Sequence, residues 1–247
     1  MTYMIERGVL HDGGVPVRQM PSPNHSGAFR QAPAILVMHY TAGGSAEGSA
    51  SWLANPQANA SAHIVIGRDG RVIQCVSLDN RAWHAGRSSW QGLSGLNSYA
   101  IGIELANWGP ITASGSAPYI EAAHKNGGPV RRWEAYPEAQ IVAAEAVARA
   151  IAAYHPIAEI VGHDDIAPGR KLDPGPAFEM AAFRTAVLGT GKRRHVTASR
   201  LNVRAGPGGS FPVLTSLTRG TPVSIREARG AWLRIGEDRW VSGAYVA

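Results

Sequence analysis

The stretch Ala34-Ile35-Leu36-Val37-Met38 is a short apolar run that ends directly at His39. A run of this length and composition is typical of a buried strand. The chain continues as Tyr40-Thr41-Ala42-Gly43-Gly44, a loop of mostly small residues that is open enough to admit a ligand. The pattern therefore predicts a buried strand with a histidine at its end, beside an open loop.

Further strands are predicted on the C-terminal side of this run. Residues 63–67 and 71–76 flank Arg68-Asp69-Gly70, whose turn residues indicate a β-hairpin. Residues 99–105 form another mostly apolar run, with Glu104 next to its end. These segments predict a sheet of several strands.

A segment rich in alanine begins at Pro137 and is followed by Pro156. Proline in the first turn and again beyond the end is typical of a helix, so we predict a helix over 137–154. We also predict a second helix over 177–187. Strands and helices together predict an α/β fold, a mixed sheet flanked by helices. The Gly-, Ser-, Ala- and Pro-rich insertion at 106–133 carries no pattern that predicts an element.

The charge of the chain is concentrated at one end. The 247 residues carry a net charge of +6, with 45% hydrophobic and 17% charged residues, a balance typical of a globular protein and not of a disordered one. Residues 191–247 contain ten Lys or Arg and three Asp or Glu, a net +7, whereas residues 1–190 carry a net −1. The basic excess therefore belongs to the last quarter of the chain.

This step in charge coincides with a change in composition. A polar, glycine-containing stretch follows the second predicted helix, as expected of a linker. We predict an α/β domain over 1–189, a linker over 190–194 and a small all-β barrel over 195–247. The strand-like runs of that barrel, separated by Gly, Pro and polar residues, are 196–203, 212–217, 221–225, 231–235 and 239–241.

Several classes of protein are disfavoured by what the sequence lacks. No run approaches the ~18 apolar residues of a membrane span. Residues 1–7 show no basic region leading into an apolar stretch, so we expect no secretory signal and synthesis in the cytoplasm. The single cysteine, Cys75, excludes an intrachain disulfide, and its place in a strand pattern predicts that it is buried and inert. A cysteine-nucleophile hydrolase is therefore a poor alternative.

Two histidines and one aspartate stand in places that suit a metal site. His39 ends a strand, His163 follows another short apolar run, and Asp173 lies ten residues further in a Gly- and Pro-rich loop that we expect to be rigid and non-helical. Two imidazoles and one carboxylate match a catalytic zinc site with a position left for water. Glu104 would then act as a base, and Lys171 would stabilise an oxyanion. Spacing alone leaves a structural role open for each of them.

Motif strings add a resemblance to the type 2 N-acetylmuramoyl-L-alanine amidases. That family includes peptidoglycan-recycling amidases, many phage endolysins and the peptidoglycan recognition proteins. The resemblance covers about residues 30–185. Its motifs, in chain order, are VMHYTAG at 37–43, AHIVIGRDG at 62–70, RAWHAG at 81–86, the segment 97–107 with IGIELAN, and GHDDIAPGRKLDPG at 162–175.

The resemblance implies a site with one Zn2+ per chain, held by His39, His163 and Asp173. It makes Glu104 the general base and Lys171 the stabiliser of the tetrahedral intermediate. Some relatives have a cysteine as third ligand, and others use a tyrosine near the position of Ala62, so this chain implies the version of the site that uses Glu104. The bond cleaved would be the amide between the lactyl group of N-acetylmuramic acid and L-alanine.

Further residues are candidates for binding the substrate. Trp83 and His84 would line the glycopeptide groove, with the indole ring as an apolar stacking face, and His63 lies in a neighbouring motif. Asn97 and Asn107 would hydrogen-bond the stem peptide. A structural role is open for each: packing for Trp83, a satisfied strand histidine for His63, and loop caps for the two asparagines.

The basic C-terminal segment resembles bacterial SH3-like domains over about residues 195–247. The landmarks are RLNVRAGPG at 200–208, Leu217 to Val223, AWLRI at 231–235 and RWVSGAYV at 239–246. In family members such modules tether enzymes to cell walls. A net +7 on so small a module favours an anionic wall polymer as its partner, although a solvated surface without a specific ligand is the alternative. We expect no nucleic-acid partner, because no nucleic-acid motif is present.

The sequence thus favours a zinc amidase that cleaves peptidoglycan, as a phage or prophage endolysin or a wall-remodelling enzyme. Such a protein would act at the cell wall, in the periplasm or outside the cell, after release. One alternative is a non-catalytic muropeptide-binding protein, which would not need the metal ligands. The other is a recycling amidase that acts on soluble anhydro-muropeptides, for which a wall anchor has no obvious use.

Overall fold

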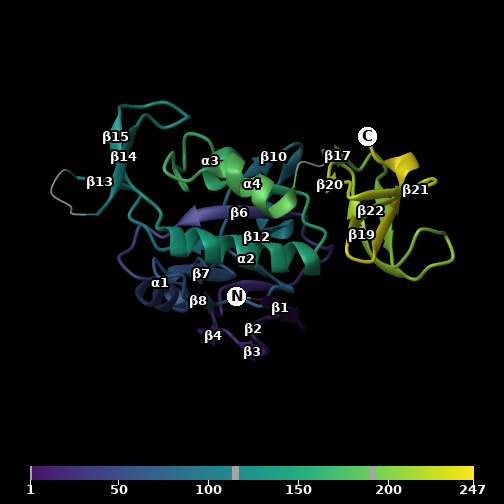
Figure 1. Cartoon of the computed structure of the whole chain (residues 1–247), viewed down its shortest axis with the longest axis horizontal. Coiled ribbons are helices and arrows are strands. Elements are labelled where there is room, and N and C mark those ends of the chain that lie inside the picture. The colour runs from purple at the N-terminus through teal and green to yellow at the C-terminus, as the bar shows by residue number, and fades with distance from the viewer. Residues whose placement is uncertain (1, 113–116, 190–192) are drawn as a thin grey trace.

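The computed structural model of the chain describes residues 2–112, 117–189 and 193–247 (Figure 1). A larger α/β part and a smaller C-terminal β part lie side by side, and the colour gradient shows that each is continuous in sequence apart from the undescribed residues (Figure 1). This architecture confirms the predicted fold class.

A six-stranded mixed sheet forms the centre of the larger part, in the order β16-β6-β12-β7-β8-β4. Its four strands from β16 to β7 are parallel, and β8 returns antiparallel to β7, as the predicted hairpin requires. The strands are β4 (Arg18–Gln19), β6 (Ile35–Tyr40), β7 (Ile64–Ile66), β8 (Val72–Gln74), β12 (Ala100–Leu105) and β16 (Glu159–Gly162).

The apolar run that ends at His39 supplies both faces of this sheet. Alternate side chains of a strand point to opposite faces, so Leu36 and Met38 join the larger core cluster while Ile35 and Val37 join a second one. Full burial on both sides explains why the run shows no polar alternation.

Helices α2 (Glu138–Tyr154) and α4 (Met180–Leu188) pack against the first face of the sheet. The prediction for α2 is confirmed, with Pro137 at its N-cap and the small side chains of Ala144 and Ala148 buried. The α4 helix begins three residues later than predicted, because Phe178 is held in a turn against Gly175 and fills the core.

The second face is covered by shorter elements. Helix α1 (Ala46–Leu53) packs there against Val65 and Ile73, and Cys75 is buried beneath it, as predicted. Burial raises the pKa of the Cys75 thiol to about 12, so the thiol stays protonated and inert. One-turn elements complete the part: α3 (His163–Ile166), η1 (Pro56–Ala58) and η2 (Leu96–Ser98).

Several strands at the periphery carry no pattern in the sequence and were not predicted. The insertion at 106–133 contributes a small sheet. Trp133, at the end of the insertion, is almost fully buried and anchors this sheet. These peripheral strands are β1 (Tyr3–Glu6), β2 (Val9–Asp12), β3 (Val15–Pro16), β5 (His25–Ala28), β9 (Asn80–Ala82), β10 (Ser89–Trp90), β11 (Leu93–Ser94), β13 (Pro110–Ile111), β14 (Tyr119–Ala122) and β15 (Arg131–Glu134).

The C-terminal part has a core of its own, built from residues such as Leu201, Val203 and Val241. It pairs β17 with β20 and orders the other strands β19-β18-β23-β22-β21. Its elements are β17 (Arg193–His195), β18 (Arg200–Arg204), β19 (Val213–Thr218), β20 (Pro222–Ser224), β21 (Glu227–Arg229), β22 (Trp232–Gly236), β23 (Arg239–Ser242) and η3 (Gly243–Tyr245).

One boundary predicted for this part needs correction, and one strand was not predicted. Residues 193 and 194, placed in the linker from sequence, pair with β20 and so belong to the sheet, whereas positions 190–192 of that linker lie outside the described residues. Strand β21 was not predicted, because its Glu227-Ala228-Arg229 sequence is polar and its backbone is held by β22. None of the helices in the described ranges is long and apolar enough to cross a membrane.

Candidate active site

The chemistry-bearing side chains gather where three neighbouring parallel strands end. His39 lies in β6, Glu104 lies directly beside it in β12, and His163 follows the last residue of β16. Paired positions on adjacent parallel strands point to the same face, so His39 and Glu104 face one space. Crevices at the carboxyl ends of parallel strands are the usual ligand sites of such sheets.

The loop after β16 brings the third member of the group into place. Its first residues, His163–Ile166, form the one-turn helix α3, which corrects the prediction of a non-helical loop. The Asp165 carboxylate accepts a hydrogen bond from the backbone N–H of Gly162 at 2.8 Å and so stabilises this turn. The Asp164 backbone N–H donates to the Asp173 carbonyl oxygen at 2.8 Å, which draws Asp173 back beside His163.

His39, His163 and Asp173 form a compact, buried group. His39 Nδ1 lies 2.9 Å from both His163 Nδ1 and Asp173 Oδ2, and His163 Nδ1 lies 2.9 Å from the same oxygen. All three residues are at least nine-tenths buried. The structure therefore brings together the three residues that the sequence proposes as metal ligands.

The hydrogen-bond partners of the rings determine which ring nitrogens carry protons. A carbonyl oxygen only accepts, so the Ala100 carbonyl, 3.3 Å from His84 Nε2, places a proton there and leaves His84 Nδ1 as an acceptor. His84 Nδ1 in turn accepts from His39 Nε2 at 3.0 Å, which leaves His39 Nδ1 unprotonated.

The same reasoning applies to the second ligand. The Ala85 carbonyl, 3.1 Å from His163 Nε2, places the proton on that nitrogen and leaves His163 Nδ1 with a lone pair. Burial lowers the pKa of His39 to about 4, so its ring is neutral near pH 7. Two nitrogen lone pairs and a carboxylate oxygen then converge without a proton between them, and such a donor set fits a zinc ion.

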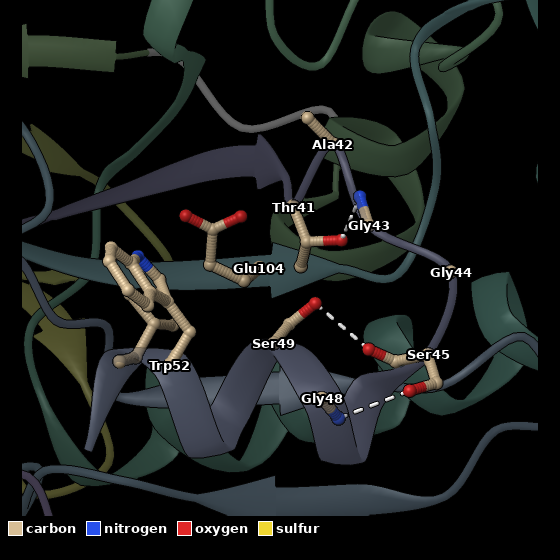
Figure 2. Close-up of a pocket in the computed structure, with 10 residues that line it drawn as sticks. Thr41, Ala42, Gly43, Gly44, Ser45, Gly48, Ser49, Trp52 and Glu104 are labelled. Atoms are coloured by element: carbon tan, nitrogen blue, oxygen red, sulfur yellow. Dashed lines mark hydrogen bonds between the residues drawn. The ribbon is translucent and has the colours of Figure 1, made fainter. Parts of the chain in front are cut away.

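Glu104 has the surroundings of a reactive carboxyl group. Its Oε2 is buried and has no hydrogen-bond partner among the residues that the structure describes. Burial, with a smaller contribution from the negative charge of Asp173, raises the pKa of Glu104 to about 8. Figure 2 shows this carboxylate directed into a hollow above α1, between Trp52 and Thr41. A carboxyl group that titrates near neutral pH suits proton transfer.

Two adjoining hollows make up the space in front of these groups. One, of about 440 Å³, contains the metal-ligand candidates His163 and Asp173 together with Lys171, Trp83 and His84. The other, of about 400 Å³, is lined by the small-residue loop that follows His39 and by one face of α1 (Figure 2). Glu104, Thr41 and Trp52 line both, so the two hollows form one cleft. Lys171 shares the cleft with Glu104, the arrangement that the sequence proposes.

The substrate-binding candidates divide into two groups. Trp83 and His84 line the cleft, although His84 also orients His39, a role that sequence reasoning missed. His63 lies outside the described cleft lining: its ring accepts from the Gly102 N–H and donates to the Asn80 carbonyl oxygen, and it is fully buried. These bonds fit the structural alternative for His63.

The two asparagines also have local partners. Asn97 Oδ1 accepts from the backbone N–H groups of His84 and Ala85 and so holds the segment that carries the His84 ring and the Ala85 carbonyl group. Asn107 is buried, with its side chain bonded to Glu134 O and Gly109 N. Both arrangements fit the loop-cap alternative given above.

The insertion at 106–133 supports the site from outside, and no motif in the sequence indicates this. His124 lies 3.0 Å from Asp164 Oδ2, and Lys125 Nζ lies 2.8 Å from the other oxygen of the same carboxylate. Asn126 adds a bond to the Asp164 carbonyl oxygen. The insertion therefore fixes the residue that follows the ligand candidate His163. A partner set of this kind depends on packing between distant segments and cannot be read from local sequence.

Gly102 offers a test of how tightly the ligand candidate His39 is oriented. A methyl group at Gly102 would collide with the His84 ring, which holds His39. We expect Gly102→Ala to destabilise the α/β domain by about 1–3 kcal/mol in urea unfolding. We also expect it to weaken zinc binding about 10- to 100-fold in a chelator competition. Gly209→Ala is the matched control, since an added methyl there meets open space; equal effects of the two changes would contradict this role of His84.

A buried set of two imidazoles and one carboxylate, with a carboxyl group and an ammonium group facing the same cleft, is the donor set of a metal-dependent hydrolase. The family model for N-acetylmuramoyl-L-alanine amidases matches residues 29–176, and the model for the bacterial SH3 domain matches residues 199–247. The chain therefore belongs to the N-acetylmuramoyl-L-alanine amidase family and is an amidase with a C-terminal bacterial SH3 domain, as predicted.

Similar proteins agree with this assignment. The 1,6-anhydro-N-acetylmuramyl-L-alanine amidase AmpD of Escherichia coli (strain K12) is 35% identical over 204 residues, which cover 74% of this chain and 97% of AmpD. A crystal structure of a Se-Met AmpD derivative matches with a TM-score of 0.53 at 32% identity, covering 74% of this chain and 99% of that one. The E. coli amidase AmiD in complex with the substrate anhydro-N-acetylmuramic acid-L-Ala-D-gamma-Glu-L-Lys matches with a TM-score of 0.52 at 29% identity, covering 76% of this chain and 67% of that one.

Proposed function

We propose that this amidase acts on soluble 1,6-anhydro-muropeptides and cleaves the amide between the lactyl group of the anhydro-muramic acid and L-alanine. The observation that carries the proposal is the similarity to AmpD over 97% of AmpD's length, since the name of that enzyme specifies the anhydro substrate. The substrate bound in the AmiD complex is of the same class. This favours the recycling amidase over the endolysin that the sequence favours.

The site is proposed to hold one zinc ion per chain, through His39 Nδ1, His163 Nδ1 and Asp173 Oδ2. A zinc ion there would supply Lewis acidity, which polarises a carbonyl group and lowers the pKa of water. His84 and the Ala85 carbonyl hold the two imidazoles in the tautomers that such a ligand set requires.

Two side chains of the cleft are proposed to perform the proton transfer and the charge stabilisation. The Glu104 carboxylate, whose Oε2 has no hydrogen-bond partner among the described residues, takes the proton of the attacking water and returns it to the leaving amine nitrogen as the C–N bond breaks. The Lys171 ammonium group, in the same cleft, stabilises the negative charge that develops on the carbonyl oxygen. The Trp83 ring, which is only partly buried, offers the sugar an apolar surface.

A second candidate function is hydrolysis of intact peptidoglycan at the cell wall, by an endolysin or a wall-remodelling amidase. The C-terminal bacterial SH3 domain and its basic charge favour it, because residues 191–247 carry a net +7 and would bind an anionic wall polymer. This candidate places the protein at the wall after its release, whereas the first requires only contact with soluble muropeptides.

The two candidates predict different products. We expect the zinc-loaded protein to release stem peptide from a soluble anhydro-muropeptide with a kcat/KM at least about tenfold above that for the same bond in intact sacculi, about 1.4 kcal/mol of discrimination. Mass spectrometry of both digests, over matched amounts of cleavable bond, measures the ratio. A ratio below one would favour the wall-cleaving function, and boiled enzyme serves as the control.

A further inference from the structure

A second cavity, of about 480 Å³, lies where the two domains meet. Residues from both domains line it, and its described lining shares no residue with the catalytic cleft. The amidase domain contributes residues that follow β5, lie in β9 and precede β12, whereas the SH3 domain contributes Ser199, which precedes β18, and residues of β18 and β19. The lining residues are Arg30, Gln31, Arg81, Ser98, Tyr99, Ser199, Arg200, Ser216 and Thr218.

Direct contacts between the domains build this junction. The Arg239 guanidinium of β23 donates to the Tyr154 carbonyl oxygen at the C-terminal end of α2, and His195 bonds to the side chain of Gln91. A cation at the C-terminal end of a helix is favoured by the helix dipole. Strand β20 also lies beside β16 of the central sheet.

The cavity presents positive charge without its usual partners. Arg30 and Arg81 come from the amidase domain and Arg200 from the SH3 domain, and none of the described lining residues is acidic. Within the described residues, no carboxylate forms an ion pair with any of the three guanidinium groups. Arg81 Nε is buried and, among those residues, finds no hydrogen-bond acceptor.

The polar groups around the arginines suit an oxygen-rich ligand. Arg200 Nε donates to Ser216 Oγ at 3.1 Å, and Ser98, Ser199 and Thr218 add further hydroxyl groups to the lining. Guanidinium groups pair with carboxylate and phosphate oxygens through parallel hydrogen bonds. A cavity of this size is in the range that holds a small ligand or one unit of a polymer.

We propose that the junction cavity binds an oxyanion, a carboxylate or phosphate group of a wall-derived ligand, and that both domains contribute to its binding. The carboxylates of a stem peptide and the phosphates of an anionic wall polymer share this chemistry. The site differs from a basic surface of the SH3 domain alone because two of its three described arginines, Arg30 and Arg81, belong to the amidase domain. It is independent of the anhydro-muropeptide reaction, which takes place in another cleft.

The test compares four single variants of the full chain in two matched pairs, by isothermal titration calorimetry with a glycerol phosphate oligomer and with the free peptide L-Ala-D-γ-Glu-L-Lys. The first pair is Arg30→Gln and Arg7→Gln, both exposed arginines of the amidase domain. The second is Arg200→Gln and Arg219→Gln, both exposed arginines of the SH3 domain. Each pair loses the same charge, but only the first member lines the cavity.

We expect at least one probe to bind the wild type, and both Arg30→Gln and Arg200→Gln to weaken it about tenfold or more. The two controls should change its affinity by less than about twofold at constant salt. Which probe responds identifies the source of the oxyanion. Equal effects of Arg30→Gln and Arg7→Gln would overturn the shared site, as would failure of both probes to bind the wild type. Hydrolysis of the soluble anhydro-muropeptide, measured in the same variants, should stay at the wild-type rate, so a failure of the proposed function is seen separately.

Discussion

Replacing His39 or Asp173 by alanine should lower kcat/KM for muropeptide hydrolysis by about 10³-fold or more, because a metal ion contributes several kcal/mol to the stabilisation of charge in the transition state. The three proposed ligand atoms lie 2.9 Å from one another. His39→Ala removes one of the two imidazoles of this set, and Asp173→Ala removes its carboxylate, so each variant keeps two ligand atoms. Zinc content after dialysis, measured by atomic emission, should fall together with activity.

The matched control for this experiment is His11→Ala. His11 lies partly exposed in β2, outside the described lining of the catalytic cleft, so its loss should change neither zinc content nor turnover. An Asp173→Ala protein that kept both its zinc and its turnover would show that the ligand assignment is wrong. Thermal unfolding of each variant with excess zinc separates loss of the metal from loss of the fold.

Replacing Glu104 by glutamine should separate metal binding from turnover. Glutamine has nearly the same shape but cannot take a proton from water, so kcat should fall about 10²- to 10⁴-fold while zinc stays bound. Glu104 lies beside His39 in the sheet, and the ligand triad is complete without it. Burial raises the pKa of the Glu104 carboxyl group to about 8. Because Glu104→Gln removes this buried ionisable group, the substitution should not destabilise the domain.

Glu47→Gln provides the control for this second experiment, since Glu47 is a half-exposed carboxylate on α1 outside the described lining of the cleft. Single-turnover kinetics and zinc content are measured on both proteins. Wild-type turnover in Glu104→Gln would remove Glu104 from the mechanism. Loss of zinc in that variant would instead place Glu104 among the ligands.

Local sequence predicted most of the elements that carry the site. The run 34–38, the hairpin around Gly70 and the helix 137–154 are all present, because burial on both faces, turn residues and flanking prolines act over a few neighbouring residues. The short strands of the insertion and β21 were beyond such reasoning, since each is only two to four residues long and forms by pairing its backbone with another strand.

The candidate site divides in the same way. The residue types of the ligand set, Glu104 and Lys171 stand in recognisable motifs, and the structure gathers them in one cleft. From sequence, His84 and Asn97 were candidates for substrate binding, with a loop cap as the alternative for Asn97, and their bonds in the structure also hold His39 and the segment of Ala85. A histidine or an asparagine can either bind substrate or hold a neighbouring segment, so the role of each is decided by the residues that pack around it.

By itself, then, the sequence determined the class of fold, the order of the two domains and the identity of the metal-ligand candidates, since these depend on local periodicity and on motifs within single segments. The tertiary structure decided which nitrogen of each imidazole faces the site, through the carbonyl groups of Ala100 and Ala85, which lie far from His39 and His163 in the chain. It also decided that arginines of both domains face one cavity. Contacts of this kind arise only when separate segments pack together, and no local pattern encodes them.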